Sequence, residues 1–202
     1  MTVNAFANFK FKIKVVEREC LTEVELERLL NLKFEQERLV YVKDLFLFSC
    51  FTGLAYIDIK NLKRQNIIFN EGIFWIKSRR TKTGIEASVP LLHPAKSILE
   101  KYNQGWVQSP ENHSLFHMIS NQKMNAYLKE IAVCSQIKKV VTFHLARHTF
   151  ATTVALLNSV PIETVSKMLG HSRITMTQHY SRVIDTKIAK DAQQLINKYK
   201  RG

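Results

Sequence analysis

Cysteine and long apolar runs are both scarce in this sequence. Cysteine occurs only three times, as Cys20, Cys50 and Cys134. The three positions are widely separated and have apolar neighbours. An odd count without close spacing argues against a disulfide framework and against a zinc ribbon. The most apolar run, residues 45–56, is too short to cross a bilayer and predicts a buried helix instead. Because no secretory signal is recognisable either, we expect a cytoplasmic protein without a membrane partner.

Acidic residues are also in deficit. The sequence has 17 Asp and Glu against 30 Lys and Arg, which leaves a formal net charge of +13. Such an excess predicts a partner with a dense negative surface, either nucleic acid or anionic lipid. Lipid is the weaker alternative, because no basic cluster lies beside an apolar span or a lipidation signal.

The length and hydrophobic content predict one globular domain, since the chain has 202 residues and is 46% hydrophobic. Residues 9–15 alternate between apolar and basic, which fits either an edge strand or an extended linker. A capping box at Thr22 predicts the start of a helix. A second helix is expected from Glu37 to about Thr52, ended by Gly53.

The middle of the sequence predicts a small sheet. Segments 66–69, 73–76 and 87–91 have strand patterns, and turns at Gly72 and at Thr83-Gly84 join them. After Pro94 the pattern is helical apart from a polar loop at 105–112, and the expected helices are 94–103, 120–134, 144–158, 161–169, 173–181 and 186–199. The predicted fold class is mainly α with a small three-stranded antiparallel β-sheet, that is, α+β.

The segment His144-Leu145-Ala146-Arg147-His148 is the most informative for chemistry. On a helix, His144, Arg147 and His148 share one face. A guanidinium offers planar donors and an imidazole exchanges protons, which together suit an anionic oxygen ligand. A buried helix start with one satisfied histidine is an equally good explanation. Zinc is disfavoured, because Leu145 stands where a zincin helix has glutamate and Arg147 would repel a cation.

A second candidate lies at Gly170-His171-Ser172. Gly170 is expected to end one helix and Ser172 to cap the next. His171 would then lie beside backbone N–H groups that can hold a phosphate oxygen. Tyr180 follows, although by itself this tyrosine is more typical of an amphipathic core residue than of a nucleophile.

Basic residues also gather on the second predicted strand and its turn, at Lys77, Arg79, Arg80 and Lys82. A hairpin tip that carries a lysine could reach a groove and contact a base edge or a phosphate. For Lys77, Arg79 and Arg80 a solvated run of charge, with general attraction to the DNA backbone, is the preferred interpretation.

Taken in order, these motifs resemble the catalytic domain of the tyrosine recombinase (phage integrase) family, of the mobile-element type. The similarity covers roughly residues 20–190. The matching segments are Thr52-Gly53-Leu54 with Asp58 and Leu62, Lys82 ahead of Val89-Pro90-Leu91, His144-x-x-Arg147-His148, Leu169-Gly170-His171-Ser172 and Tyr180. The resemblance implies that residues 1–20 are an interdomain linker and 21–202 the catalytic domain with a C-terminal helix, without the family's N-terminal core-binding domain.

The resemblance also implies roles for these residues. Tyr180 would attack a DNA phosphodiester and form a 3′-phosphotyrosyl bond, while Arg147 and His171 hold the non-bridging oxygens. His144 would assist proton transfer and Lys82 would protonate the departing 5′-oxygen. Supporting and DNA-binding roles fall to Asp58, His148, Lys77, Arg79, Arg80 and Arg173. No ATP, metal or other cofactor is implied, and the sequence lacks a nucleoside-triphosphate loop and a carboxylate pair.

One position departs from the family pattern. Ala55 stands where family members usually carry an arginine that clamps the scissile phosphate. Three outcomes remain open: another basic residue reaches in, with Arg79 and Arg80 as candidates, or the enzyme is slow, or the protein binds DNA without cutting it. An active enzyme is favoured, and a type IB-like topoisomerase is a more distant alternative.

The resemblance finally implies partners and a setting. Double-stranded DNA is the expected partner, in a bacterial cytoplasm. The full-length protein would act as a homotetramer on DNA, and this chain alone would be a monomer.

Overall fold

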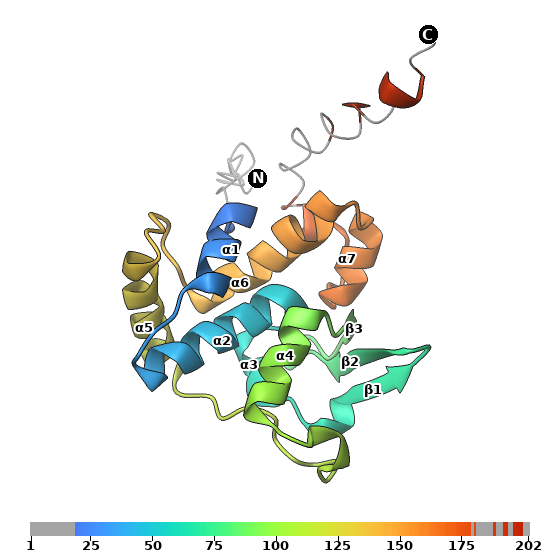
Figure 1. Ribbon diagram of the computed structural model, residues 1–202. Coiled ribbons are helices and arrows are strands. Elements are labelled where there is room, and N and C mark those ends of the chain that lie inside the picture. The colour runs from blue at the N-terminus through green and yellow to red at the C-terminus, as the bar shows by residue number, and fades with distance from the viewer. Residues whose placement is uncertain (1–18, 179, 181–187, 189–191, 194–195, 200–202) are drawn as a thin grey trace, which may run out of the picture.

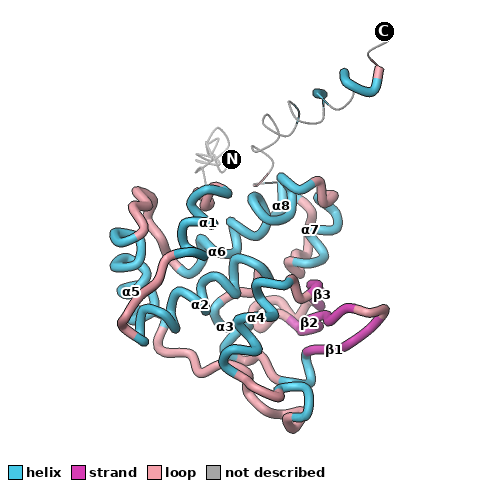
Figure 2. The backbone as a smooth tube through the Cα atoms, viewed as in Figure 1, coloured by secondary structure: helices cyan, strands magenta, loops and turns pink. Residues whose placement is uncertain are grey.

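The computed structural model describes residues 19–178, 180, 188, 192–193 and 196–199 (Figure 1). The alternating segment at 9–15 lies outside them, and so does half of the helix expected at 186–199. Within the described part, helices pack around one another and a three-stranded antiparallel sheet lies at one side of them (Figure 2). The predicted fold class is therefore confirmed.

The elements follow one another in the expected order. The strands are β1 (Ile67–Asn70), β2 (Ile73–Arg79) and β3 (Glu86–Pro90). The helices are α1 (Glu23–Asn31), α2 (Glu37–Thr52), α3 (Tyr56–Lys60), α4 (His93–Tyr102), α5 (Asn121–Cys134), α6 (Phe143–Thr149), α7 (Ile162–Met168) and α8 (Thr175–Gln178).

Helix α2 forms the centre of the core. Every side chain from Leu45 to Thr52 is buried, and α4, α5 and α6 pack against the helix. Burying each large apolar side chain in such a position stabilises the fold by about 1.5–3 kcal/mol. The helix ends at Gly53 with a left-handed φ of 68°. A Cβ at Gly53 would lie 2.5 Å from Cδ1 of Phe150, so this turn is also a point of close packing.

The predicted N-terminal capping box of α1 is confirmed. The hydroxyl of Thr22 accepts a hydrogen bond from the backbone N–H of Glu25 at 3.2 Å, and the Glu25 carboxylate accepts one from the N–H of Thr22 at 2.7 Å. These two bonds satisfy donors that a helix N-terminus otherwise leaves unpaired.

The sheet has the order β1-β2-β3, with Ile76 of β2 opposite Ile67 on one side and Val89 on the other. These three side chains are buried and fix the register, because a slip by one residue would turn them to the solvent. Helix α7 packs against β3. Strand β2 runs three residues further than predicted, as far as Arg79, because that residue still pairs with Glu86.

The single helix predicted for 144–158 is only partly right. Helix α6 ends at Thr149, and the chain continues as a π-helical segment, Phe150–Ala155, and a 3-10 turn, Leu156–Asn158. Two threonine hydroxyls compete with the regular backbone pattern here. That of Thr149 donates to the carbonyl of Leu145 and accepts from the N–H of Leu21, and that of Thr153 donates to the carbonyl of Leu21.

Two further expectations need correction. Helix α8 begins at Thr175, so Ser172 does not cap it, and the Ser172 hydroxyl instead lies 3.5 Å from Sδ of Met176. The loop at 105–112 is not uniformly polar, because Trp106 is buried in a 3-10 turn with the Arg64 guanidinium 5.5 Å from its ring centre.

The scarce features noted in the sequence have simple structural counterparts. The three cysteines are all free thiols. Among the residues that the structure describes, no helix is long and apolar enough to cross a membrane.

Candidate active site

The guanidinium of Arg147 is the fixed point of the site. Helix α6 carries it into the interior, where the residue is only 4% exposed. Its Nη1 donates to the carbonyl oxygen of Gly53 at 2.6 Å, and its Nη2 donates to that of Leu169 at 2.5 Å. Arg147 therefore joins the end of α2 to the end of α7. Sequence reasoning did not identify these two carbonyl partners, because nothing in a pattern shows which distant backbone groups a side chain will meet.

Arg147 remains charged at neutral pH. Its pKa is lowered to about 10, chiefly by burial and then by the positive charge of Arg80. The nearby groups of Tyr180 and Asp58 act in the opposite direction. A buried cation with two donors spent on carbonyl oxygens still has further N–H groups for an anion.

Four rings form a continuous row beside this cation. The ring centres of His144 and His148 are 4.5 Å apart, and that of His148 is 5.2 Å from the ring of Tyr180. The rings of His171 and Tyr180 are stacked, with their centres 6.4 Å apart. Segments that lie far apart in the sequence are thereby brought together around Tyr180.

Tyr180 is buried, as expected for an amphipathic core residue. It is 6% exposed and belongs to a small apolar cluster with Val89, Phe150 and Leu169. Its backbone N–H donates to the carbonyl of Thr177 at 2.9 Å, directly after α8. The tyrosine is thus a core residue of this cluster and at the same time the neighbour of two histidine rings.

The ring of His171 is oriented by a neighbour that the sequence analysis missed. Its Nδ1 lies 2.8 Å from the hydroxyl of Thr177, which is fully buried. The backbone N–H of His171 donates to the carbonyl of Ser166 at 3.0 Å. These two contacts fix the place of His171 in the corner between α7 and α8.

A hollow of about 280 Å³ adjoins Arg147. Ala55 lies in its wall, at the position where the family pattern has an arginine. Its lining consists of Ala55, Tyr56, Ile57, Asn121, Asn125, Thr142, Phe143, His144 and Arg147. The small side chain of Ala55 therefore leaves space next to two of the predicted catalytic residues.

The tip of the β2–β3 hairpin is tied to α3 through Asp58. One carboxylate oxygen of Asp58 accepts from the backbone N–H of Thr81 at 3.0 Å, and the other lies 3.6 Å from Nε of Arg80. The side chains of Arg80 and Asp58 are 11% and 3% exposed. The interpretation of Arg80 as part of a solvated run is therefore wrong, because this residue follows β2 directly and its side chain turns inward to Asp58.

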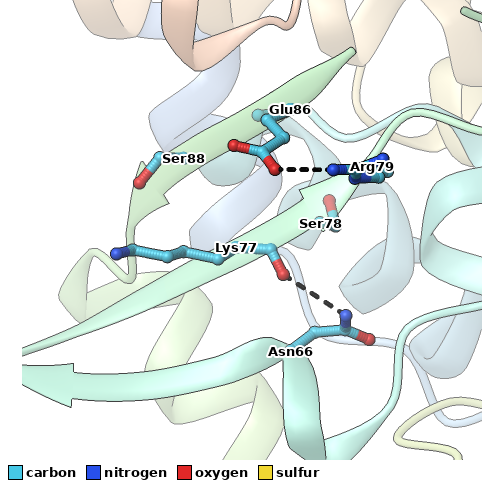
Figure 3. Close-up of a pocket in the computed structure, with 7 residues that line it drawn as sticks. Asn66, Lys77, Ser78, Arg79, Glu86 and Ser88 are labelled. Atoms are coloured by element: carbon cyan, nitrogen blue, oxygen red, sulfur yellow. Dashed lines mark hydrogen bonds and ion pairs between the residues drawn. The ribbon is translucent and has the colours of Figure 1, made fainter. Parts of the chain in front are cut away.

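Lys77 and Arg79 lie on the outer face of the same strand (Figure 3). Arg79 makes an ion pair with Glu86 at 3.2 Å, and both side chains are largely exposed. The backbone carbonyl of Lys77 accepts a hydrogen bond from the side chain of Asn66 at 3.3 Å. These residues, with Ser78, Ala87 and Ser88, line an open hollow of about 380 Å³ on the sheet.

Lys82 and Arg173 also lie on the surface rather than in the buried part of the site. Lys82 is exposed in the turn between β2 and β3, and Arg173 is exposed before α8. No group of three or more potential metal ligands is found among the described residues.

The chain is similar to a well-defined group of proteins. A model of the phage integrase family matches residues 19–187. A tyrosine recombinase of Pseudothermotoga lettingae is 28% identical over 163 residues, which are 80% of this chain and 55% of that protein. A tyrosine recombinase of Agathobacter rectalis is 31% identical over 161 residues, 77% of this chain and 50% of that protein. The chain thus spans about half the length of these relatives.

Solved structures share the fold. A XerH site-specific recombinase bound to a palindromic difH substrate, in a post-cleavage complex, superposes with a TM-score of 0.69 at 20% identity, over 88% of this chain and 53% of that one. The Tn1549 transposon integrase in complex with a circular intermediate DNA gives a TM-score of 0.66 at 16% identity, over 91% and 70%. Family, fold and the ordered motifs agree, and this chain belongs to the phage integrase family.

Proposed function

We propose that this chain is the catalytic domain of a site-specific DNA recombinase that cleaves and rejoins DNA through a 3′-phosphotyrosyl intermediate. The observation that carries the proposal is the convergence of Tyr180, His148, His171 and Arg147, which come from separate segments of the chain. An ordinary core does not require two histidines and a buried arginine around one tyrosine.

The geometry supports a division of labour. Tyr180 attacks the scissile phosphorus, and its phenolic oxygen replaces the 5′-oxygen of the next nucleotide. Arg147 and His171 donate to the non-bridging oxygens, on which negative charge builds up in the transition state. His144, exposed at the start of α6, takes up the proton that Tyr180 releases, and His148 packs between these two rings.

Lys82 is proposed as the general acid for the departing oxygen. Its position in the exposed β2–β3 turn suits a group that reaches the DNA only when the complex has formed. The bond energy is conserved in the phosphotyrosyl ester, and the religation step returns it to the DNA, so that the scheme uses neither ATP nor a metal.

The DNA partner is proposed from charge and from the structural neighbours. The formal net charge of +13 favours a polyanion, and the two neighbours described above were solved with DNA. Lys77, Arg79 and Arg173 are proposed to contact the DNA backbone. We further propose that residues 1–20 are a linker, that 21–202 are the catalytic domain, and that the complete protein acts as a tetramer at paired sites in a bacterial cytoplasm.

A covalent capture experiment tests the function and does not require that the target site be known. The complete protein that carries this sequence is incubated with a library of nicked duplexes of randomised sequence, and protein–DNA adducts are isolated under denaturing conditions and sequenced. We expect adducts with the parent protein and none with Tyr180→Phe. Tyr199→Phe is the matched control, because that side chain is 72% exposed and should not affect the yield.

Two other functions predict different results. A non-cleaving DNA-binding protein, which Ala55 favours, would retain library DNA only under native conditions. A type IB-like topoisomerase would relax a supercoiled plasmid without exchanging strands between two duplexes. An adduct that persists in Tyr180→Phe would refute the assignment of the nucleophile.

A further inference from the structure

Among the described residues, the interior beside Tyr180 contains more positive than negative charge. Arg147 and Arg80 are both buried or nearly so, and Asp58 is a buried carboxylate that faces them. The charge of Arg80 contributes to the lowered pKa of Arg147, and two guanidinium groups so close together are costly in a low-dielectric site unless an anion joins them. This arrangement indicates that both cations are placed for a ligand.

Consecutive residues of one turn hold the two arginines. The carbonyl oxygen of Leu169 accepts the hydrogen bond from Nη2 of Arg147. The next residue is Gly170, and a Cβ there would lie 2.8 Å from Cδ and 3.0 Å from Cγ of Arg80. The methylene groups of Arg80 therefore pass directly over Gly170, which places Arg80 on the same corner as His171.

The backbone of Arg80 is fixed by the hairpin turn. Its N–H donates to the carbonyl of Ile85 at 2.9 Å, and its own carbonyl accepts from the N–H of Gly84 at 2.8 Å. Asp58 then holds Nε of the side chain at 3.6 Å. Among the described residues the two Nη groups of Arg80 make no hydrogen bond, so these donors remain for a ligand.

Asp58 also connects Arg80 with Ala55, the residue at which the sequence departs from the family pattern. The backbone N–H of Asp58 donates to the carbonyl of Ala55 at 3.0 Å, across the first turn of α3. Arg80 is thus tethered one helical turn away from Ala55.

We propose that Arg80 supplies the phosphate contact that the family pattern assigns to position 55, with Asp58 as its positioning residue. The inference rests on the proposed function. It predicts that the two Nη groups of Arg80 donate to a non-bridging oxygen of the scissile phosphate, opposite Arg147. In this role Arg80 is a catalytic residue, whereas Arg79, its neighbour on the outer face, is not.

The test compares Arg80→Gln with Arg38→Gln in the complete protein, with the captured DNA as substrate. Arg38 is the control because its exposed side chain pairs with Glu130 at 2.8 Å and has no proposed role at the site. Glutamine keeps the methylene groups over Gly170 and removes only the charge. We expect adduct formation to slow by about a hundredfold or more in Arg80→Gln and less than about twofold in Arg38→Gln. Adding Ala55→Arg to Arg80→Gln should recover at least about tenfold of the loss. Equal rates for the two glutamine variants would overturn the inference.

A modified substrate distinguishes contact with the phosphate from a structural role. A methylphosphonate at the scissile position removes one negative charge, so a missing cation matters less there. The penalty of Arg80→Gln should shrink by about tenfold or more on this substrate. A penalty of the same size on both substrates would contradict direct contact.

A binding measurement keeps the inference testable even without cleavage. Orthovanadate imitates a phosphoryl group in transfer, and calorimetric titration with the Tyr180→Phe protein reports its affinity. We expect about tenfold weaker binding when Arg80→Gln is added and no change with Arg38→Gln. If the parent forms no adduct but this difference is found, the proposed function fails and the anion site stands. If adducts form and vanadate binding is unaffected by Arg80→Gln, the function stands and the inference fails.

Discussion

Two neighbouring arginines at the end of β2 have opposite roles. Arg79, the last residue of the strand, points to the outer face and pairs with Glu86 in the solvent, whereas Arg80 points to the inner face and is held between Asp58 and Gly170. The difference arises because successive residues of an extended chain point to opposite sides, and because the corner at Gly170 packs against the inner side. Adjacent arginines in a basic run therefore cannot be assigned one common role.

The largest expected effect concerns the most buried cation of the inner face. Arg147→Ala should lower the free energy of unfolding by about 3 kcal/mol, because the carbonyl oxygens of Gly53 and Leu169 would lose their donors in the interior. Urea denaturation of this variant and of Arg79→Ala provides the comparison. A loss below about 1 kcal/mol for Arg147→Ala would show that these two bonds do not join α2 to α7 as described.

The carboxylates behind the two faces should also differ. Asp58→Asn should cost about 2 kcal/mol, because the buried Nε of Arg80 would then face a neutral amide. Glu86→Gln should cause no measurable change, because exposed ion pairs contribute little. Thermal and urea unfolding of both variants measure the loss of unfolding free energy. An equal loss in the two variants would contradict the distinction between the two faces.

The contact between Arg80 and Gly170 predicts a smaller effect on the free energy of unfolding, and a double-mutant cycle can identify it. Gly170→Ala should destabilise the protein by about 1–2 kcal/mol, since φ is 58° and the new methyl group would meet the Arg80 side chain. Gly84→Ala has a similar φ of 67° but open space around it, so it reports backbone strain alone. In a double-mutant cycle, Gly170→Ala should destabilise the Arg80→Ala protein only as much as Gly84→Ala destabilises the parent, because the clash with the Arg80 side chain is gone. Strictly additive losses of Gly170→Ala and Arg80→Ala would contradict the contact.

The smallest effect is expected on the outer face. Arg79→Ala should leave folding unchanged and reduce the salt dependence of DNA binding by about one unit in the slope of log K against log salt. Fluorescence anisotropy over a range of salt concentrations measures this slope. An unchanged slope would place Arg79 away from the DNA backbone.

The sequence predicted the order of the elements apart from α3, and several residues that it singled out, among them Arg147, His171 and Tyr180, lie together in the structure. The capping box at Thr22, the stop at Gly53 and the hairpin at Gly72 are local signals, and local signals determine where elements begin and end. The interruption of the helix after Thr149 was missed, because it depends on contacts with Leu21, which is distant in the sequence. The same limitation explains why the burial of Arg80 was not foreseen.

Mapping the covalent bond tests the central claim most directly. The adduct from the capture experiment is digested with a protease and a nuclease, and mass spectrometry locates the peptide that retains a nucleotide. We predict a single modified residue, Tyr180, linked to a 3′-phosphate. A nucleotide on another tyrosine, or a linkage to a 5′-phosphate, would contradict the assignment of Tyr180 as the nucleophile of this domain.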